Sequence, residues 1–207
     1  GGQQQRIAIV RALACEPKIL LFDEASSNID PQFRFELIAD IRGLLKAQNT
    51  AALFVTHNQD EAFAFSDRIA VLNQGKIEQI DEAAQLFKRP ATRFVAEFLG
   101  PGVWLDAKVT GPNRVQTQFG QIEYLGAKVL PEAKSEPGQV YLRPHQLSLV
   151  PNASSELVVH KERFVGECFE ATLTIGDRDI TVKTDVSLLQ QAVEVKIKTR
   201  LESIFFD

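Results

Sequence analysis

The chain has 207 residues, of which 44% are apolar and 24% are charged, and its net charge is −4. This length suits one large or two small domains, and the ordinary composition lets either half bury a core. With this slight acidity, nothing in the charge argues for nucleic acid or an anionic membrane surface as a partner. The apolar runs, such as residues 19–22 and 51–55, are far shorter than the roughly 18 residues that a membrane span needs.

Helix and strand patterns alternate over residues 1–99. Apolar residues at helical spacing predict a first helix that stops before Pro17. Residues 19–22 and 51–55 are apolar runs, which predict two fully buried strands of the kind found in parallel sheets. Between them, Asp30 as N-cap and proline directly after it predict the start of a second helix. The apolar stripe of that helix contains Leu37, Ile38, Ile41, Leu44 and Leu45.

Turn and cap signals follow in the same region. Asn58 with Glu61 three residues later has the form of a capping box and predicts the start of a third helix. Residues 73–75, Asn-Gln-Gly, predict a hairpin with a three-residue loop. Two short helices are expected after the hairpin, and the second is expected to end at Gly100.

The pattern changes at Gly100. From there to Asp207, short β-rich runs are separated by turn signals about every 8–12 residues, which predicts a small barrel or sandwich. The sequence therefore predicts an α/β domain over residues 1–100 and an all-β domain over residues 101–207.

Two adjacent carboxylates follow the first predicted strand. Asp23 and Glu24 would lie at the C-terminal edge of a parallel sheet, where open α/β folds bind their ligands. One carboxylate at such an edge can hold Mg²⁺, directly or through water, and a second can polarise an attacking water in phosphoryl transfer. Taken alone, the pattern fits a strand that runs into an acidic loop equally well.

His57 ends the second predicted strand. If the two strands are neighbours, His57 lies beside Glu24 and can contact a γ-phosphate or steady the water that Glu24 orients. A lone histidine at a strand end is more often a loop residue, and the register with the two carboxylates is what favours the functional interpretation. The first helix is preceded by Gly1, Gly2 and Gln3, a pattern that suits a nucleotide phosphate but is weak evidence by itself.

Together these segments resemble the ATP-binding subunit of an ABC transporter, a P-loop NTPase of the ABC type. Residues 1–6 match the tail of the family's signature motif, residues 19–24 its Walker B strand, and residues 27–30 its D-loop. His57 matches its switch histidine. The β-rich region resembles TOBE, a barrel-like, OB-type accessory domain of importer ATPases for ferric iron, polyamines, maltose and related solutes. Residues 143–147, Arg-Pro-His-Gln-Leu, resemble a segment of that domain.

The resemblance implies a role for each candidate residue. Glu24 would be the catalytic base, His57 the γ-phosphate sensor, and Asp23 the residue that serves Mg²⁺. Asp30 would communicate across a dimer. Contacts to the ATP held by the second copy of the chain would come from Gly1, Gly2 and Gln3. The implied cofactors are ATP and Mg²⁺.

Some elements of the family pattern do not occur in these 207 residues. There is no Gly-x-x-x-x-Gly-Lys-Ser/Thr segment, which cradles the phosphates in this family, and no Q-loop or methionine. The resemblance therefore implies that the chain is the C-terminal part of a longer protein that hydrolyses ATP. The chain by itself is expected neither to bind nor to hydrolyse ATP.

The resemblance also implies partners and a location. The partners would be a second copy of the chain, transmembrane permease subunits and, indirectly, an extracytoplasmic solute-binding protein, with no nucleic acid partner. The protein would lie peripherally on the cytoplasmic face of the cell membrane and drive solute import. The end of the helical region, residues 98–100, favours ferric iron as the solute, with polyamine or sugar as alternatives. Two other functions stay open: a non-catalytic dimerisation or regulatory module, and an ABC-type ATPase without a transport role.

Overall fold

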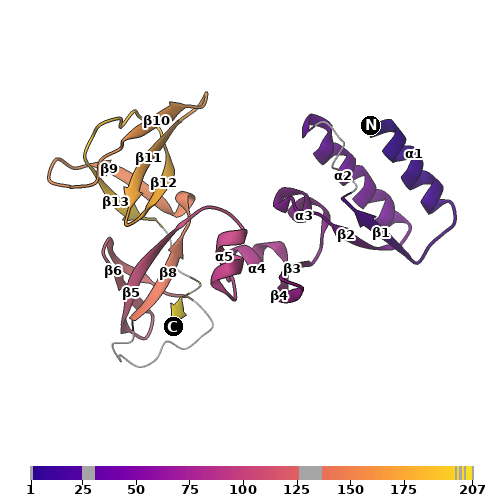
Figure 1. Ribbon diagram of the computed structural model, residues 1–207, viewed down its shortest axis with the longest axis horizontal. Helices are drawn as coiled ribbons and strands as arrows, with labels where there is room; N and C mark the ends of the chain where they lie inside the picture. Colours follow the sequence, from indigo (N-terminus) through magenta and orange to yellow (C-terminus); the bar gives the residue numbers. More distant parts are fainter. Residues whose placement is uncertain are drawn as a thin grey trace. The chain divides into compact units, whose positions relative to one another are not determined.

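The computed structural model describes residues 2–24, 31–125, 137–198, 200, 202 and 204–206. They form two compact units, Gly1–Ala84 and Gln85–Asp207 (Figure 1). The change of sequence pattern at Gly100 thus lies inside the second unit, while the compact units divide earlier, after Ala84.

The N-terminal unit alternates helices and strands over its described residues. Its helices are α1 (Gly2–Leu13), α2 (Pro31–Ala47) and α3 (Gln59–Phe65), and its strands are β1 (Ile19–Asp23), β2 (Ala51–Val55), β3 (Ile69–Asn73) and β4 (Lys76–Asp81). β1 and β2 pair in parallel, with Ile19 opposite Ala51 and Asp23 opposite Val55. The α/β class predicted for this region is confirmed, and so is the pairing of these two strands as neighbours.

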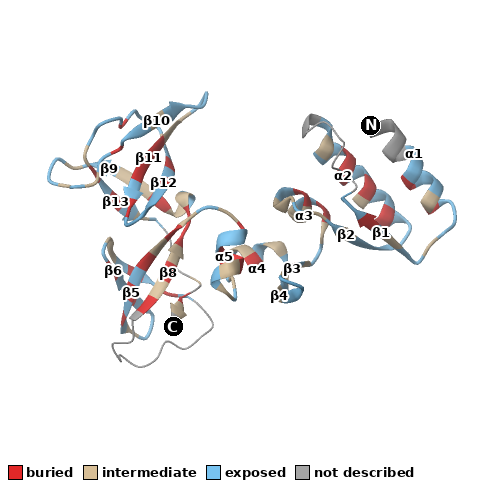
Figure 2. Cartoon of the chain, viewed as in Figure 1, coloured by how far each residue is buried: buried red, intermediate tan, exposed pale blue. Residues whose placement is uncertain are grey.

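The core of this unit lies on one face of the β1–β2 pair (Figure 2). It contains Ile9 and Leu13 of α1, Leu37, Ile38, Ile41 and Leu45 of α2, Phe22 of β1 and Phe65 of α3. Leu44, which the helical spacing assigned to the same stripe, is exposed instead. The predicted stripe of α2 is therefore confirmed except at Leu44, whereas on α1 the apolar residues Ile7 and Val10 are exposed and Ile9 is buried instead.

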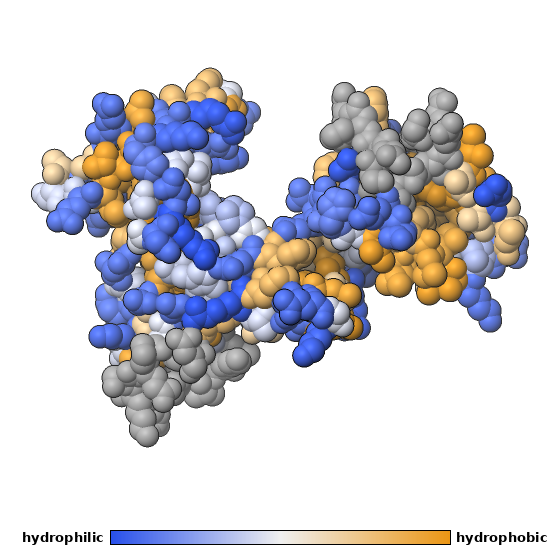
Figure 3. Space-filling model, in the orientation of Figure 1, coloured by the Kyte–Doolittle hydropathy of each residue, from blue (hydrophilic) through white to orange (hydrophobic). Residues whose placement is uncertain are grey.

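The opposite face of the β1–β2 pair is apolar but exposed. Successive side chains of a strand point to opposite faces, and Ile19, Leu21 and Leu53 are exposed to 56%, 71% and 57%. Figure 3 shows apolar atoms gathered over this unit. The prediction that both strands are fully buried is wrong for the described chain, because helices cover only one of the two apolar faces.

β3 and β4 form the predicted hairpin, but its loop is shorter than expected. Asn73 pairs directly with Lys76, so two residues connect the strands. Gln74 and Gly75 have φ angles of 48° and 77°. Two successive residues with positive φ are typical of the tight turns whose twist matches that of the flanking strands, and they replace the predicted three-residue loop.

The second unit is β-rich. Its helices are α4 (Ala83–Lys88), which starts at the end of the first unit, and α5 (Arg93–Phe98). Its described strands are β5 (Val103–Gly111), β6 (Arg114–Thr117), β7 (Gly120–Glu123), β8 (Pro137–Leu142), β9 (Leu147–Pro151), β10 (Lys161–Phe164), β11 (Phe169–Ile175), β12 (Arg178–Thr184), β13 (Val193–Ile197) and β14 (Phe205–Phe206). They form sheets in the orders β14-β8-β5-β6-β7, β10-β11-β12 and β13-β9. This confirms the predicted β character.

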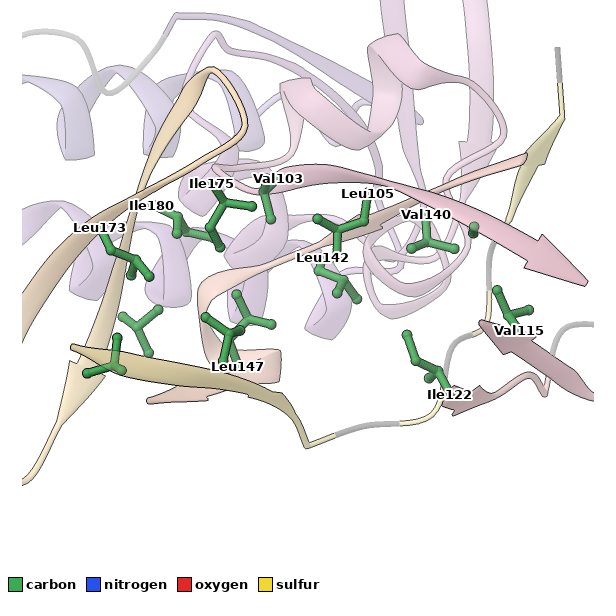
Figure 4. Packing of buried hydrophobic residues seen from close by; sticks show 14 of the residues in the cluster. Val103, Leu105, Val115, Ile122, Val140, Leu142, Leu147, Leu173, Ile175 and Ile180 are labelled. Atoms are coloured by element: carbon green, nitrogen blue, oxygen red, sulfur yellow. The ribbon is translucent and has the colours of Figure 1, made fainter. Parts of the chain in front are cut away.

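Buried apolar residues, which alternate with more exposed residues along the strands, build the core of the second unit. In β5, Val103, Leu105, Ala107 and Val109 are buried while the residues between them face outward. Val115 of β6, Val140 of β8 and Leu173 of β11 are fully buried and belong to the same cluster. Figure 4 shows labelled members of this cluster, among them Leu105, Val140 and Leu173, spread along the space between the strands.

One buried charge fixes α5 to the strands of its own unit. Arg143 is 5% exposed, and its guanidinium donates to the carbonyl oxygens of Ala96 and Gly100, each at 3.1 Å. The same group lies 4.0 Å from the centre of the Phe87 ring. Since the last carbonyls of a helix have no partner within it, Arg143 supplies the donors that they lack. Burial lowers the pKa of Arg143.

Candidate functional site

The parallel pairing of β1 and β2 brings their C-terminal ends together. Asp23 lies opposite Val55, and the N–H of Glu24 donates to the carbonyl oxygen of Val55 at 3.0 Å. The main chain on both sides of this edge is therefore fixed by ladder hydrogen bonds. Ligands of open α/β folds bind at this edge of a sheet, which makes it the candidate site.

Glu24 and His57 are in direct contact at this edge. Nδ1 of His57 lies 3.1 Å from Oε1 of Glu24, which confirms the predicted neighbourhood of the two side chains. The side chains are exposed to 78% for His57 and 53% for Glu24, so a ligand can reach both. An exposed pair of this kind contributes no more than about 1 kcal/mol, so the contact depends on how the backbone places the two residues.

The backbone of Glu24 is strained. Its φ is 45°, in the left-handed region that costs a residue other than glycine about 1–2 kcal/mol. Strained backbone of this kind is frequent at functional sites, where the surrounding structure holds it in place. Here it turns the chain out of β1 directly after Asp23.

A hydrogen-bond network shapes the loop around His57. Oγ1 of Thr56 donates to Oε2 of Glu61 at 2.7 Å and accepts the N–H of Asn58 at 3.0 Å. Oδ1 of Asn58 accepts the N–H groups of Asp60 and Glu61, which confirms Asn58 as the N-cap of α3. The network therefore fixes Thr56 and Asn58, the residues directly before and after His57.

Sequence reasoning assigned Glu61 the wrong partners. The capping box would direct its carboxylate back to the N–H of Asn58, but it binds Thr56 and, at 3.1 Å, Arg34 of α2. Glu61 and Phe65 are four residues apart on α3 and are both buried. That spacing on the core face is the signal in the sequence that marks Glu61 as a buried carboxylate.

The chemistry of the edge fits Mg²⁺. Mg²⁺ takes oxygen ligands, keeps several waters and is often held by one or two carboxylates together with substrate phosphates. Asp23 offers an exposed carboxylate at the end of β1. Within the described ranges, no group of three or more His, Cys, Asp and Glu side chains gathers to hold a metal ion.

The other predicted site residues are only partly visible. Gly2 and Gln3 form the start of α1, and the position of the Gln3 side chain lies outside the described residues. Gly1 and Asp30 also lie outside the described residues. Of the predicted site residues, the structure brings Glu24 and His57 into contact and places Asp23 at the end of β1, next to Glu24 in the chain.

Comparison with known proteins identifies the relatives of the chain. The family model described as ABC transporter matches residues 1–27. The Fe(3+) ions import ATP-binding protein FbpC of Escherichia coli O157:H7 is 37% identical over 196 residues, which cover 92% of this chain and 54% of that protein. The sulfate/thiosulfate import ATP-binding protein CysA of Mannheimia succiniciproducens is 39% identical over 161 residues, covering 78% of this chain and 45% of that protein. The CysA of Bordetella pertussis is 42% identical over 149 residues, which cover 72% of this chain and 41% of that protein.

These matches extend well beyond the short segment recognised by the family model. The chain spans about half the length of the curated relatives that it matches. Among the described helices, none combines the length and the apolar character that crossing a membrane requires. By its sequence, the chain is related to the ATP-binding subunits of ABC importers.

Proposed function

We propose that the protein containing this chain is the ATP-hydrolysing subunit of an ABC importer. The observation that carries the proposal is the 3.1 Å contact between Glu24 and His57 at the C-terminal edge of the β1–β2 pair. The similarity to importer ATP-binding subunits supports the same reaction.

Each exposed side chain at the edge has a task in this reaction. The Glu24 carboxylate accepts a hydrogen bond from the attacking water and directs it towards the γ-phosphate. Since Nδ1 of His57 contacts Glu24, Nε2 would be the ring nitrogen that contacts a phosphate oxygen. Asp23 would hold Mg²⁺, directly or through water, and the bound ion supplies charge that neutralises the phosphate oxygens.

The proposal includes a second copy of the chain. Gly1, Gly2 and Gln3 would contact the ATP held by the opposite copy, and Asp30 would communicate between the two sites. Closing and reopening of this dimer would move transmembrane permease subunits, with the protein bound peripherally at the cytoplasmic face of the membrane. The resemblance to importer subunits supports this arrangement.

Ferric iron is the solute that we propose. The match to the ferric-iron importer subunit runs over 196 residues and so includes most of the β-rich unit, whereas the matches to the two sulfate/thiosulfate subunits cover 161 and 149 residues. Deleting the gene should therefore lower uptake of radioactive ferric iron and leave sulfate uptake unchanged. Loss of sulfate uptake alone would favour the sulfate/thiosulfate importers instead.

The reaction itself is tested by Glu24→Gln in the full-length protein. ATP binding should survive, while the turnover number should fall at least about 100-fold, because the amide cannot accept the proton of the water. Glu16→Gln is a matched control, since Glu16 is another exposed carboxylate with a positive φ, 48°, at the other end of β1. Unchanged turnover in Glu24→Gln would contradict the proposed role.

A further inference from the structure

The contact between Glu24 and His57 needs support from elsewhere in the fold. Both side chains are largely exposed, and solvent and salt weaken exposed ion pairs. His57 also lies beyond the end of β2, where the sheet ladder no longer holds the backbone. Some other interaction must therefore place His57 where it meets Glu24.

Glu61 is the side chain built to supply this support. It is 2% exposed, the lowest value among the charged residues in the described part of the chain. Its carboxylate lies 2.7 Å from Oγ1 of Thr56 and 3.1 Å from the guanidinium of Arg34. A buried carboxylate without partners is strongly unfavourable, so the buried position of Glu61 holds Thr56 to it.

Thr56 passes this constraint to the loop. Its hydroxyl donates to Glu61 and at the same time accepts the N–H of Asn58, so it ties together the residues on either side of His57. The base of the loop is equally fixed. Phe54 stacks on Phe65 with ring centres 4.6 Å apart, and Phe65 also meets Phe22 at 5.8 Å. β1, β2 and α3 are thereby packed against one another below the site.

We propose that Thr56 and Glu61 are positioning residues for ATP hydrolysis: they hold His57 at Glu24 without contacting the nucleotide. This inference rests on the proposed function of the Glu24–His57 pair. Glu61 would then affect the rate of hydrolysis only by way of the position of His57.

Thr56 provides the sharper test. Glu61→Ala would leave the Arg34 cation without its buried partner and destabilise the unit as a whole. Thr56→Val removes only the hydroxyl and keeps the shape, and Thr56→Ser keeps the hydroxyl. In the full-length protein, Thr56→Val should lower kcat about tenfold with KM for ATP unchanged, while Thr56→Ser should stay within about twofold of the wild type.

The decisive comparison repeats Thr56→Val in a His57→Ala background. If Thr56 acts through His57, the second substitution should lower kcat no further, because residues that act as a unit are not additive. If Thr56→Val lowers kcat equally with and without His57, the positioning role is contradicted, whereas the proposed function of the Glu24–His57 pair is not. Unchanged turnover in His57→Ala would contradict the proposed function of His57 and, with it, this inference.

A control and an independent measurement complete the test. Asp67→Asn breaks the contacts of Asp67 with Arg42 and Lys46, at 2.7 and 3.1 Å, on another part of α2, and should leave kcat unchanged. Amide hydrogen exchange reports on the loop without reference to catalysis: Thr56→Val should speed exchange at Asn58, whose N–H loses its acceptor. An unchanged exchange rate at Asn58 would contradict the proposal that the Thr56 hydroxyl holds this loop in place.

Discussion

Arg143 shows how one side chain can secure a whole segment. Its guanidinium donates to Ala96 and Gly100 and lies over the ring of Phe87. Arg143→Gln should lower the free energy of unfolding of the second unit by about 2–3 kcal/mol, because buried carbonyls lose charged donors. Urea unfolding followed by Trp104 fluorescence measures this. The exposed pair of Arg163 with Glu170 is the control, and Arg163→Gln should cost less than about 1 kcal/mol.

His145 gives the same unit a dependence on pH. Partial burial lowers its pKa below the ordinary 6.5, and the charge of Arg143 lowers it further. Between the lowered pKa and 6.5, the unfolded chain binds a proton that the folded chain does not. Stability should therefore be complete above about pH 6.5 and fall as the pH drops through the folded pKa. His145→Phe keeps the stack on Phe87 but cannot titrate, so the difference in urea midpoint between the two proteins should shrink or reverse on acidification. A constant difference from pH 7.5 to about pH 5.5 would contradict this.

At the scale of elements, two glycines should respond to alanine with opposite signs. Gly75 closes the β3–β4 hairpin with φ of 77°, so Gly75→Ala should cost about 1 kcal/mol. Gly43 lies within α2 with open space where a Cβ would be, so Gly43→Ala should stabilise by about 0.5–1 kcal/mol. Denaturant unfolding of both variants tests this, and shifts of the same sign would refute it.

Elements with strong local signals were predictable from the sequence, whereas side-chain contacts between packed helices were not. Residues 19–22, the hairpin and the cap at Asn58 are local patterns, and all three appear in the structure. β6 and β7 give only weak local signals, because each has four residues with a single apolar side chain, Val115 or Ile122, among polar ones. At the site, the contact of His57 with Glu24 followed from strand ends, but the Arg34–Glu61 pair depends on how α3 packs against α2. No local pattern encodes such a pairing.

At the scale of the whole molecule, the two units have separate cores. Ile38 belongs to one and Leu173 to the other, and each is almost completely buried. Ile38→Ala and Leu173→Ala should each cost about 2–5 kcal/mol, but only in their own unit. Scanning calorimetry should then show two transitions, with each substitution lowering one of them. A single transition that moves with both substitutions would mean that the units unfold together.

The left-handed backbone of Glu24 sets stability against activity at one position. Glycine there would relieve about 1–2 kcal/mol of strain, partly offset by its greater freedom in the unfolded chain, but it would remove the carboxylate. Stabilising substitutions can be found at many positions of a protein, and many of them leave its function unchanged. Under the proposed function residue 24 is different, because the exchange that relaxes the fold would also remove the proposed catalytic base. In a lineage no longer selected for ATP turnover, this carboxylate would be among the first to be lost.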